Sequence, residues 1–137
     1  MIPHRLIGTI YTLAVKVKLH EKSNADMEHF STYDRFSDTY SWRPFDGCSY
    51  LLVPSSKKGD EISLTLYLCV DCDMSAAKLK RFVQDILEKD FFQRTWGTSI
   101  IHIGKPALFL RPHAYKQEDE DEADYRSEKI IDFITSE

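Results

Sequence analysis

The sequence predicts an α+β domain whose sheet is mainly antiparallel, has about five strands and carries its helices on one face. Residues 7–19 alternate between apolar and polar side chains, which is the period of a half-buried strand. Residues 74–91 carry apolar side chains three and four positions apart, which is the period of an amphipathic helix. The strands come in adjacent pairs with short turns, and this favours an antiparallel sheet over a doubly wound parallel one.

The segment after the first strand changes to apolar side chains three and four positions apart. Met27, Phe30 and Tyr33 show this spacing, which predicts a short helix over residues 24–36. An aromatic-rich segment follows and extends to residue 45. We therefore expect an excursion between the first strand and the second.

The middle of the chain predicts an antiparallel hairpin followed by the long helix. Residues 49–54 and 61–71 alternate as strands, and the Ser-Lys-Gly stretch between them predicts a turn over residues 54–60. In the helix over residues 74–91, one apolar stripe is expected to pack on the sheet while the lysines face water. Asp73 is the expected N-cap of this helix.

Two further strands are predicted over residues 99–103 and 107–111, joined by a short turn at 104–106. Apolar residues within 126–135 then predict a final helix. The expected order is strand, short helix, two strands, helix, two strands, helix. With its acidic balance, this order resembles that of type III secretion chaperones, although their leading helix is replaced here by a long strand.

The length of 137 residues suits a single core. We expect one α+β domain over residues 1–117, an acidic linker over 118–124 and a short C-terminal helix over 125–137. Six carboxylates lie within 118–124, and residues 125–137 carry a net charge of −1. Because the whole chain has a net charge of −4, residues 1–117 carry about +3. The body is mildly basic and the linker strongly acidic.

Cys69 and Cys72 have the C-x-x-C spacing of a redox pair or of half a zinc site. Cys69 lies inside a predicted strand, where a small buried side chain is the simplest interpretation. The carboxylates at 71 and 73 would raise the thiol pKa values, and zinc would need two more ligands. A small metal- or thiol-dependent enzyme centred on Cys69–Ser75 is the main alternative to a binding function.

The same segment reads Asp71-x-Asp73-x-Ser75 after an apolar run, and this is similar to the nucleophile motif of haloacid-dehalogenase-type phosphatases. The resemblance implies that the first Asp attacks phosphorus and that the second acts as general acid. It covers about ten residues. That family also has a doubly wound parallel sheet, whereas the neighbouring strands here are predicted to form hairpins.

The signatures of phosphate-binding loops, dinucleotide-binding folds, serine hydrolases and zinc proteases are missing from the sequence. The five histidines are scattered, and no metal or other cofactor is expected. A basic face around Lys78, Arg81 and Lys105 is modest, and the acidic run would compete with phosphate for it. Nucleic-acid binding is therefore a weaker alternative.

The aromatic segment provides the predicted partner-binding residues. Large aromatic side chains and arginine dominate binding hot spots, and an exposed acidic run attracts a basic partner surface. The residues assigned to partner binding are Tyr33, Phe36, Tyr40, Trp42, Arg43, Phe45, Glu118, Asp119, Glu120, Asp121 and Glu122. Packing within the core is the competing explanation for the aromatic side chains.

We therefore expect a non-enzymatic protein-binding module, such as a subunit of an assembly, a small chaperone or an inhibitor or immunity-type protein. Its partner is another protein, and a homodimer is a further candidate. Three cysteines cannot all pair internally, which favours a reducing compartment, cytoplasmic or nuclear. The longest apolar runs are far shorter than the ~20 residues that cross a bilayer.

Overall fold

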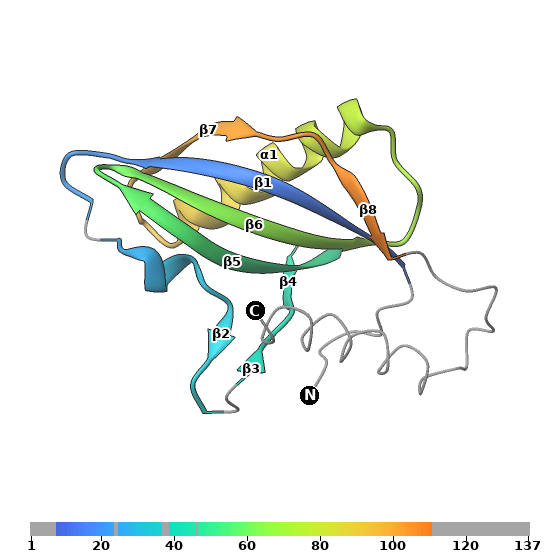
Figure 1. The fold of residues 1–137 in the computed structure, drawn as a ribbon, viewed down its shortest axis with the longest axis horizontal. Coiled ribbons are helices and arrows are strands. Elements are labelled where there is room, and N and C mark those ends of the chain that lie inside the picture. Colours follow the sequence, from blue (N-terminus) through green and yellow to red (C-terminus); the bar gives the residue numbers. More distant parts are fainter. Residues whose placement is uncertain (1–7, 24, 37–38, 46, 111–137) are drawn as a thin grey trace.

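The computed structural model describes residues 8–110 except for 24, 37–38 and 46. A six-stranded antiparallel sheet forms one layer, and the helix α1 crosses one of its faces (Figure 1). The predicted α+β class and the antiparallel sheet are confirmed. The sheet has six strands instead of about five, and α1 is the one α-helix among the described residues.

The elements follow one another in an order that differs from the predicted one, because short strands replace the first helix. They are β1 (Thr9–Leu19), the 3-10 helix η1 (Met27–Phe30), β2 (Tyr33–Asp34), β3 (Thr39–Tyr40), β4 (Arg43–Phe45), β5 (Cys48–Lys58), β6 (Glu61–Val70), α1 (Ala76–Gln93), β7 (Thr98–Ile103) and β8 (Ala107–Leu110). The sheet order is β4-β5-β6-β1-β7, with β8 also paired to β1, and β2 and β3 form a separate two-stranded sheet.

The alternation of β1 determines which side chains enter the core. Leu13, Val15 and Val17 are buried on the face that α1 covers, whereas Lys16 and Lys18 point to the other face. Because β1 pairs with β6 on one side and with β7 and β8 on the other, it is an interior strand of the sheet. This part of the prediction is confirmed.

The β5–β6 hairpin is confirmed, but its turn is shorter than predicted. Strand pairing continues to Lys58 and Glu61, so Gly59 and Asp60 alone form the turn, with Gly59 at φ +61°. A register shift between Pro54 and Ser56 absorbs the proline, which has no N–H for the sheet. The polar stretch that predicted a loop is therefore the exposed end of a strand.

The predicted turn at residues 104–106 is wrong. In the described structure, β7 and β8 both pair with β1 and follow one another along the same side of it. Gly104 continues this run, since its N–H donates to the Ala14 carbonyl over 2.7 Å. The two segments thus form one edge strand along β1, and this strand is interrupted. A bulge at Lys16/Val17 shifts its register, and Pro106 lies between β7 and β8.

The predicted helix over residues 24–36 is also wrong, because within the described positions 25–36 only the four residues of η1 are helical. Asp26 caps η1 by accepting from the Met27 N–H, and this bond, followed by the charge of Lys57, holds the Asp26 pKa below its usual value. The chain then turns so that Phe30 enters the core and Thr32 bonds to β5. Long-range contacts at the sheet edge therefore decide this segment's structure.

Helix α1 begins and ends with recognisable caps. Ser75, not Asp73, is the N-cap, and its hydroxyl accepts from the Lys78 N–H. At the other end, Thr95 donates to the Phe92 carbonyl and Trp96 to the Phe91 carbonyl, which is the Schellman pattern. The ring centroids of Phe91 and Trp96 lie 5.1 Å apart and complete this motif.

The side chains form two clusters, one on each face of the sheet. The larger cluster lies between the sheet and α1, whose buried stripe includes Leu79, Val83, Ile86 and Leu87. The smaller cluster lies on the opposite face around Trp42. No helix among the described residues is long and apolar enough to cross a membrane. The predicted acidic linker and C-terminal helix lie outside the described residues.

Candidate functional site

The aromatic side chains of residues 40–45 do not share one exposed surface. Trp42 is 3% exposed and packs against Leu51 and Tyr67 on the face away from α1. Tyr40 is half-buried beside this cluster, and burial raises the pKa of its phenol. Phe45 packs against the cluster on the other face. These three predicted binding residues therefore contribute to the packing of the domain.

Tyr33 and Phe36 are the exposed members of the predicted set. Phe36 is fully exposed, and Tyr33 is 39% exposed with its ring edge-to-face against Tyr40 at 5.4 Å. Their role in binding a partner stays a prediction. Glu118, Asp119, Glu120, Asp121 and Glu122 lie outside the described residues, so their role also stays a prediction.

Arg43 belongs to a buried polar cluster that ties β4 and β5 to the end of α1. Asp90, 3% exposed, accepts from the Tyr50 hydroxyl and from Arg94 Nε, the latter over 2.9 Å. Arg43 Nη1 lies 3.6 Å from Asp90 Oδ2 and donates to the Tyr50 hydroxyl oxygen over 3.3 Å. Burial lowers the Arg43 pKa, and Arg94 adds to this effect while Asp90 opposes it. Arg43 thus connects β4 to β5 and to the end of α1.

The Cys69–Ser75 segment does not bring its polar side chains together. Cys69 is buried in the cluster around Trp42, whereas Cys72 is exposed beyond the end of β6. Asp73 accepts from the Thr9 hydroxyl over 3.1 Å. Within the described ranges, no group of three or more His, Cys, Asp or Glu side chains could hold a metal ion. The paired strands around it are antiparallel, unlike the sheet that the phosphatase resemblance implies.

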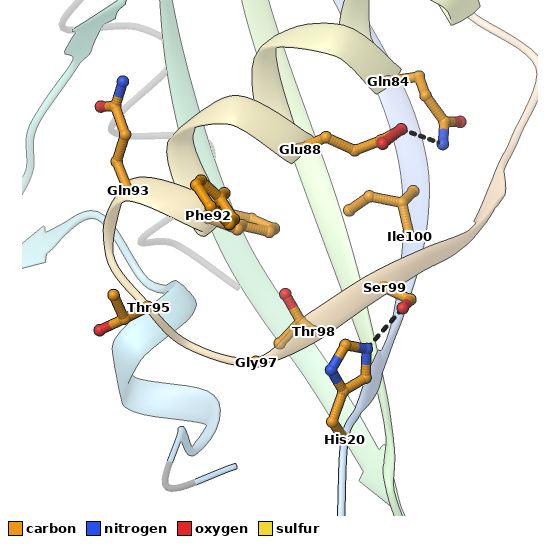
Figure 2. A pocket seen from close by; sticks show the side chains of 11 residues that line it. His20, Gln84, Glu88, Phe92, Gln93, Thr95, Gly97, Thr98, Ser99 and Ile100 are labelled. Carbon is orange, nitrogen blue, oxygen red and sulfur yellow. Dashed lines mark hydrogen bonds between the residues drawn. The ribbon is translucent and has the colours of Figure 1, made fainter.

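A groove that the sequence analysis did not identify runs between α1 and β7. Two cavities of about 780 and 540 Å³ share Gln84 and Ile100 in their linings and thus follow one another along the helix. Figure 2 shows the larger one, with Glu88 and Phe92 of α1 on one side and Ile100 of β7 on the other. The helix contributes a stripe at three- and four-residue spacing, comprising Arg81, Gln84, Glu88 and Phe92.

The backbone of β7 provides hydrogen-bonding groups at the outer side of the strand. The His20 N–H donates to the Gly97 carbonyl over 2.8 Å, so Gly97 faces β1. Backbone groups alternate in direction along an antiparallel strand, so Ser99 also faces β1, whereas Thr98 and Ile100 face outward. Among the described residues, no strand pairs with this outer side. The floor of the groove is therefore an open sheet edge.

The two ends of the groove differ in chemistry. Near the end of α1 and the start of β7, Phe92 is 83% exposed, and Phe91 and Ile100 continue the apolar lining. Near the first turns of α1, the lining contains Lys80, Arg81 and His102 together with Asp85. The groove thus combines an apolar end, an open strand edge and a mainly basic end.

The turn between α1 and β7 closes the apolar end. Thr95 occupies the position after the helix C-cap at φ +55°, a left-handed conformation that usually favours glycine. Gly97 follows at φ +66° and directs the chain back along the sheet. This tight connection makes β7 antiparallel to α1, so the start of the strand lies beside Phe92.

His20 and Ser99 form a second polar feature at the same end. The His20 ring nitrogen Nε2 and the Ser99 hydroxyl oxygen lie 2.6 Å apart. Within the described part of the chain, no carboxylate bonds to the other ring nitrogen of His20, so the pair lacks the acid that orients a catalytic triad. The bond fixes the end of β1 to the start of β7.

Two sequence signals could have indicated this groove. Phe92 follows the predicted end of the helix at residue 91 and lies outside its buried stripe, so its exposure was foreseeable from the helical period. Ile100 and Ile101 are adjacent apolar residues in a strand, where strict alternation would expose one of them. Ile101 is indeed 44% exposed.

Comparisons with protein-family models, with curated proteins and with solved structures found no match to this chain. The interpretation of the groove therefore depends on its own geometry and chemistry.

Proposed function

We propose that this chain is a protein-binding module that captures an extended segment of a partner along β7. The observation that carries the proposal is the open, apolar edge of β7 beside α1, with cavities along its length. Extended peptides commonly bind by adding a strand to an exposed sheet edge, where main-chain hydrogen bonds give affinity and side-chain pockets give specificity. The groove provides both kinds of contact.

The apolar side chains beside β7 favour a binding role for this edge over a purely structural one. Exposed edges are normally blunted by charge, by proline or by a covering segment, because they otherwise pair with other chains. On the helix side of β7, the lining instead contains the half-buried Ile100 and the largely exposed Phe92. An added strand would bond to the outward groups of Thr98 and Ile100 and cover these side chains.

A peptide library selected against the purified full-length chain tests the proposal. We expect selected peptides to bind with micromolar affinity and to lose about tenfold when Ile100 is changed to Pro, because one outward N–H is removed. Ile100→Ala is the matched control, since it removes the side chain but keeps the N–H. It should weaken binding less than Ile100→Pro.

The peptide side gives an independent measurement that does not depend on the folding of a variant. N-methylation at the peptide position that faces Ile100 should abolish binding, whereas N-methylation at the next position should be tolerated. The proposal is wrong if no selected peptide shows this alternation, or if Ile100→Pro and Ile100→Ala bind the selected peptides equally well.

A further inference from the structure

The groove also indicates the chemistry of its ligand, and this inference rests on the proposed function. We propose that the groove recognises a partner segment with a carboxylate side chain and, four residues further toward its C-terminus, a large apolar side chain. The carboxylate lies at the basic end and the apolar side chain at the Phe92 end. The segment runs antiparallel to β7.

The basic end provides cations for the carboxylate. Lys80 and Arg81 are exposed and line the smaller cavity, and within the described residues neither forms an ion pair. His102 lies in the same lining, and Asp85 is the single carboxylate there. A charge-assisted bond from arginine to a carboxylate is stronger than a neutral hydrogen bond and can be bidentate.

The apolar end provides a surface for a large side chain. Phe92 is 83% exposed, and the half-buried Ile100 lies in the same cavity lining. Burial of these surfaces by a ligand side chain removes apolar area from water, which is the general driving force for association. Thr98 and Ser99 add hydroxyl groups at the rim.

The spacing of the two ends sets the spacing of the two ligand side chains. Arg81 and Phe92 are eleven positions apart on α1, which corresponds to about 16 Å along the helix axis. Four residues of a strand span about 13 Å and return to the same face. The ligand side chains, which extend beyond the four-residue backbone span at both ends, cover the difference of about 3 Å. A spacing of three or five would turn one side chain away from the groove.

The direction follows from the pairing of β7. All strand pairs of the described sheet are antiparallel, and antiparallel pairing is slightly more stable per residue. Because β7 starts beside Phe92, an antiparallel ligand has its N-terminal part at the basic end. The carboxylate therefore precedes the apolar residue in the ligand sequence.

The middle of the groove restricts the residue between them. Gln84 lines both cavities and thus marks this region. Its Nε2 donates to Glu88 Oε1 over 2.6 Å, and Asp85 lies in the lining of the adjoining basic end. A second carboxylate two positions after the first would approach these anionic groups and be repelled. A small neutral polar side chain fits this position.

A second copy of the chain fits the groove less well than such a segment. Two β7 edges related by a two-fold axis would pair antiparallel, which places the Lys80 and Arg81 end of one copy opposite the Phe92 end of the other. The charged groups would then face apolar side chains, and the favourable pairing of the proposed ligand would be lost. We therefore assign the groove to a segment of a different protein.

Synthetic peptides with the core Asp-Thr-Asn-Thr-Phe, flanked by threonine, test this inference by calorimetry against the full-length chain. We expect micromolar binding, and binding about tenfold weaker for the reversed core Phe-Thr-Asn-Thr-Asp. Changing the central Asn to Asp should weaken binding by a similar factor. Equal binding of the forward and reversed cores would overturn the inference.

A charge exchange identifies the basic end. Arg81→Glu should bind the Asp peptide about tenfold more weakly and should prefer a peptide with Lys in place of Asp. Lys78→Glu is the matched control, because it makes the same charge change on α1 but lies outside both cavity linings. If the two variants weaken binding equally, a general charge effect accounts for the data and the inference is wrong.

Three outcomes separate this inference from the proposed function and from other occupants. If library peptides depend on the Ile100 N–H but the designed peptides do not discriminate, the proposed function stands and this inference fails. A concentration-dependent dimer that Ile100→Pro dissociates would assign the groove to a second copy and overturn it. The third outcome concerns a variant in which Glu118, Glu120 and Glu122 are changed to Gln. If this variant binds the peptides more than about fivefold more tightly, the chain's own acidic run occupies the groove and the inference is overturned.

Discussion

The two edges of the sheet present the same physical problem and differ in how the chain treats it. At β5, Thr32 donates its N–H to the Leu52 carbonyl over 3.1 Å and its hydroxyl accepts from the Leu52 N–H. Phe30 enters the core on the α1 face, and Trp42 enters the cluster on the opposite face. Residues 25–36 and 39–45 thus cover the β5 edge from both sides, whereas within the described structure no strand pairs with the outer side of β7.

The comparison explains why the aromatic residues of the chain fall into two groups. A covering segment needs large side chains to hold it on both faces, and Phe30, Trp42 and Phe45 serve this purpose. Thr32 bonds to β5 at Leu52, and the end of β5 after that point is exposed. This end carries Lys57 and Lys58, whose charges discourage pairing with another chain. The edge of β7 has Ile100 and Ile101 instead. A covered edge contributes to stability, and an open one is available for binding.

The largest expected contrast is between two phenylalanines, one at each edge. Phe30→Ala should lower the free energy of unfolding by about 4 kcal/mol, because the ring is fully buried against Phe91 and Trp96. Phe92→Ala should change it by less than about 0.5 kcal/mol, because this ring is mostly exposed. Urea unfolding of the full-length chain measures both. Similar losses for the two variants would mean that the open edge is also part of the core.

The polar cluster behind the covered edge should give the next largest effect. Asp90→Ala leaves the largely buried Arg43 guanidinium without its counter-charge, so we expect a loss of about 3 kcal/mol. Tyr50→Phe removes the hydrogen bond to Asp90 and the weaker one that the hydroxyl accepts from Arg43, and should cost about 1 to 2 kcal/mol. Thermal and urea unfolding provide the comparison. Losses of equal size in the two variants would show that the charge of Asp90 contributes nothing beyond its bond to Tyr50.

Sequence periodicity predicted the central part of this fold and failed at both edges. The alternation of β1 and the helical stripe of α1 reflect burial on a single face, which sequence records directly. The spacing of Met27, Phe30 and Tyr33 is helical, but Met27 and Phe30 pack on the core cluster while Tyr33 packs on Tyr40. No local pattern encodes that the Thr32 hydroxyl bonds to the backbone of Leu52.

The groove was missed for a related reason. Its floor is a strand edge, and backbone groups carry no sequence signal. Its walls come from α1 and from β7, and the tight turn at Thr95 and Gly97 brings these two elements together. The predicted hairpin at residues 104–106 concealed the open edge, because pairing of the last two strands with each other would have covered it.

A smaller effect should come from the hydrogen bonds that close the covered edge. Thr32→Val keeps the shape of the side chain but leaves the Leu52 N–H without an acceptor, so we expect a loss of about 1 kcal/mol. Amide hydrogen exchange gives the contrast residue by residue. The Leu52 amide should be protected in the parent chain and exchange faster in the variant. The Thr98 and Ile100 amides should exchange rapidly in both, while the Ser99 amide is protected. Strong protection of Ile100 would show that its outer edge is already occupied.

The smallest expected effect is a gain in stability at the turn that closes the apolar end of the groove. Thr95 has φ +55° after the C-cap of α1, a conformation that costs a residue with a side chain about 1 to 2 kcal/mol relative to glycine. Thr95→Gly relieves this cost, but the unfolded chain gains freedom and the 2.7 Å bond from the Thr95 hydroxyl to the Arg94 carbonyl is lost. We expect a net gain of about 0.5 kcal/mol in urea unfolding. Peptide affinity should change by less than about twofold, since the outward groups of β7 and the Phe92 ring remain in place. A clear loss of affinity in a more stable variant would mean that the left-handed turn orients the groove, and that the open edge is held in its binding form at a cost to stability.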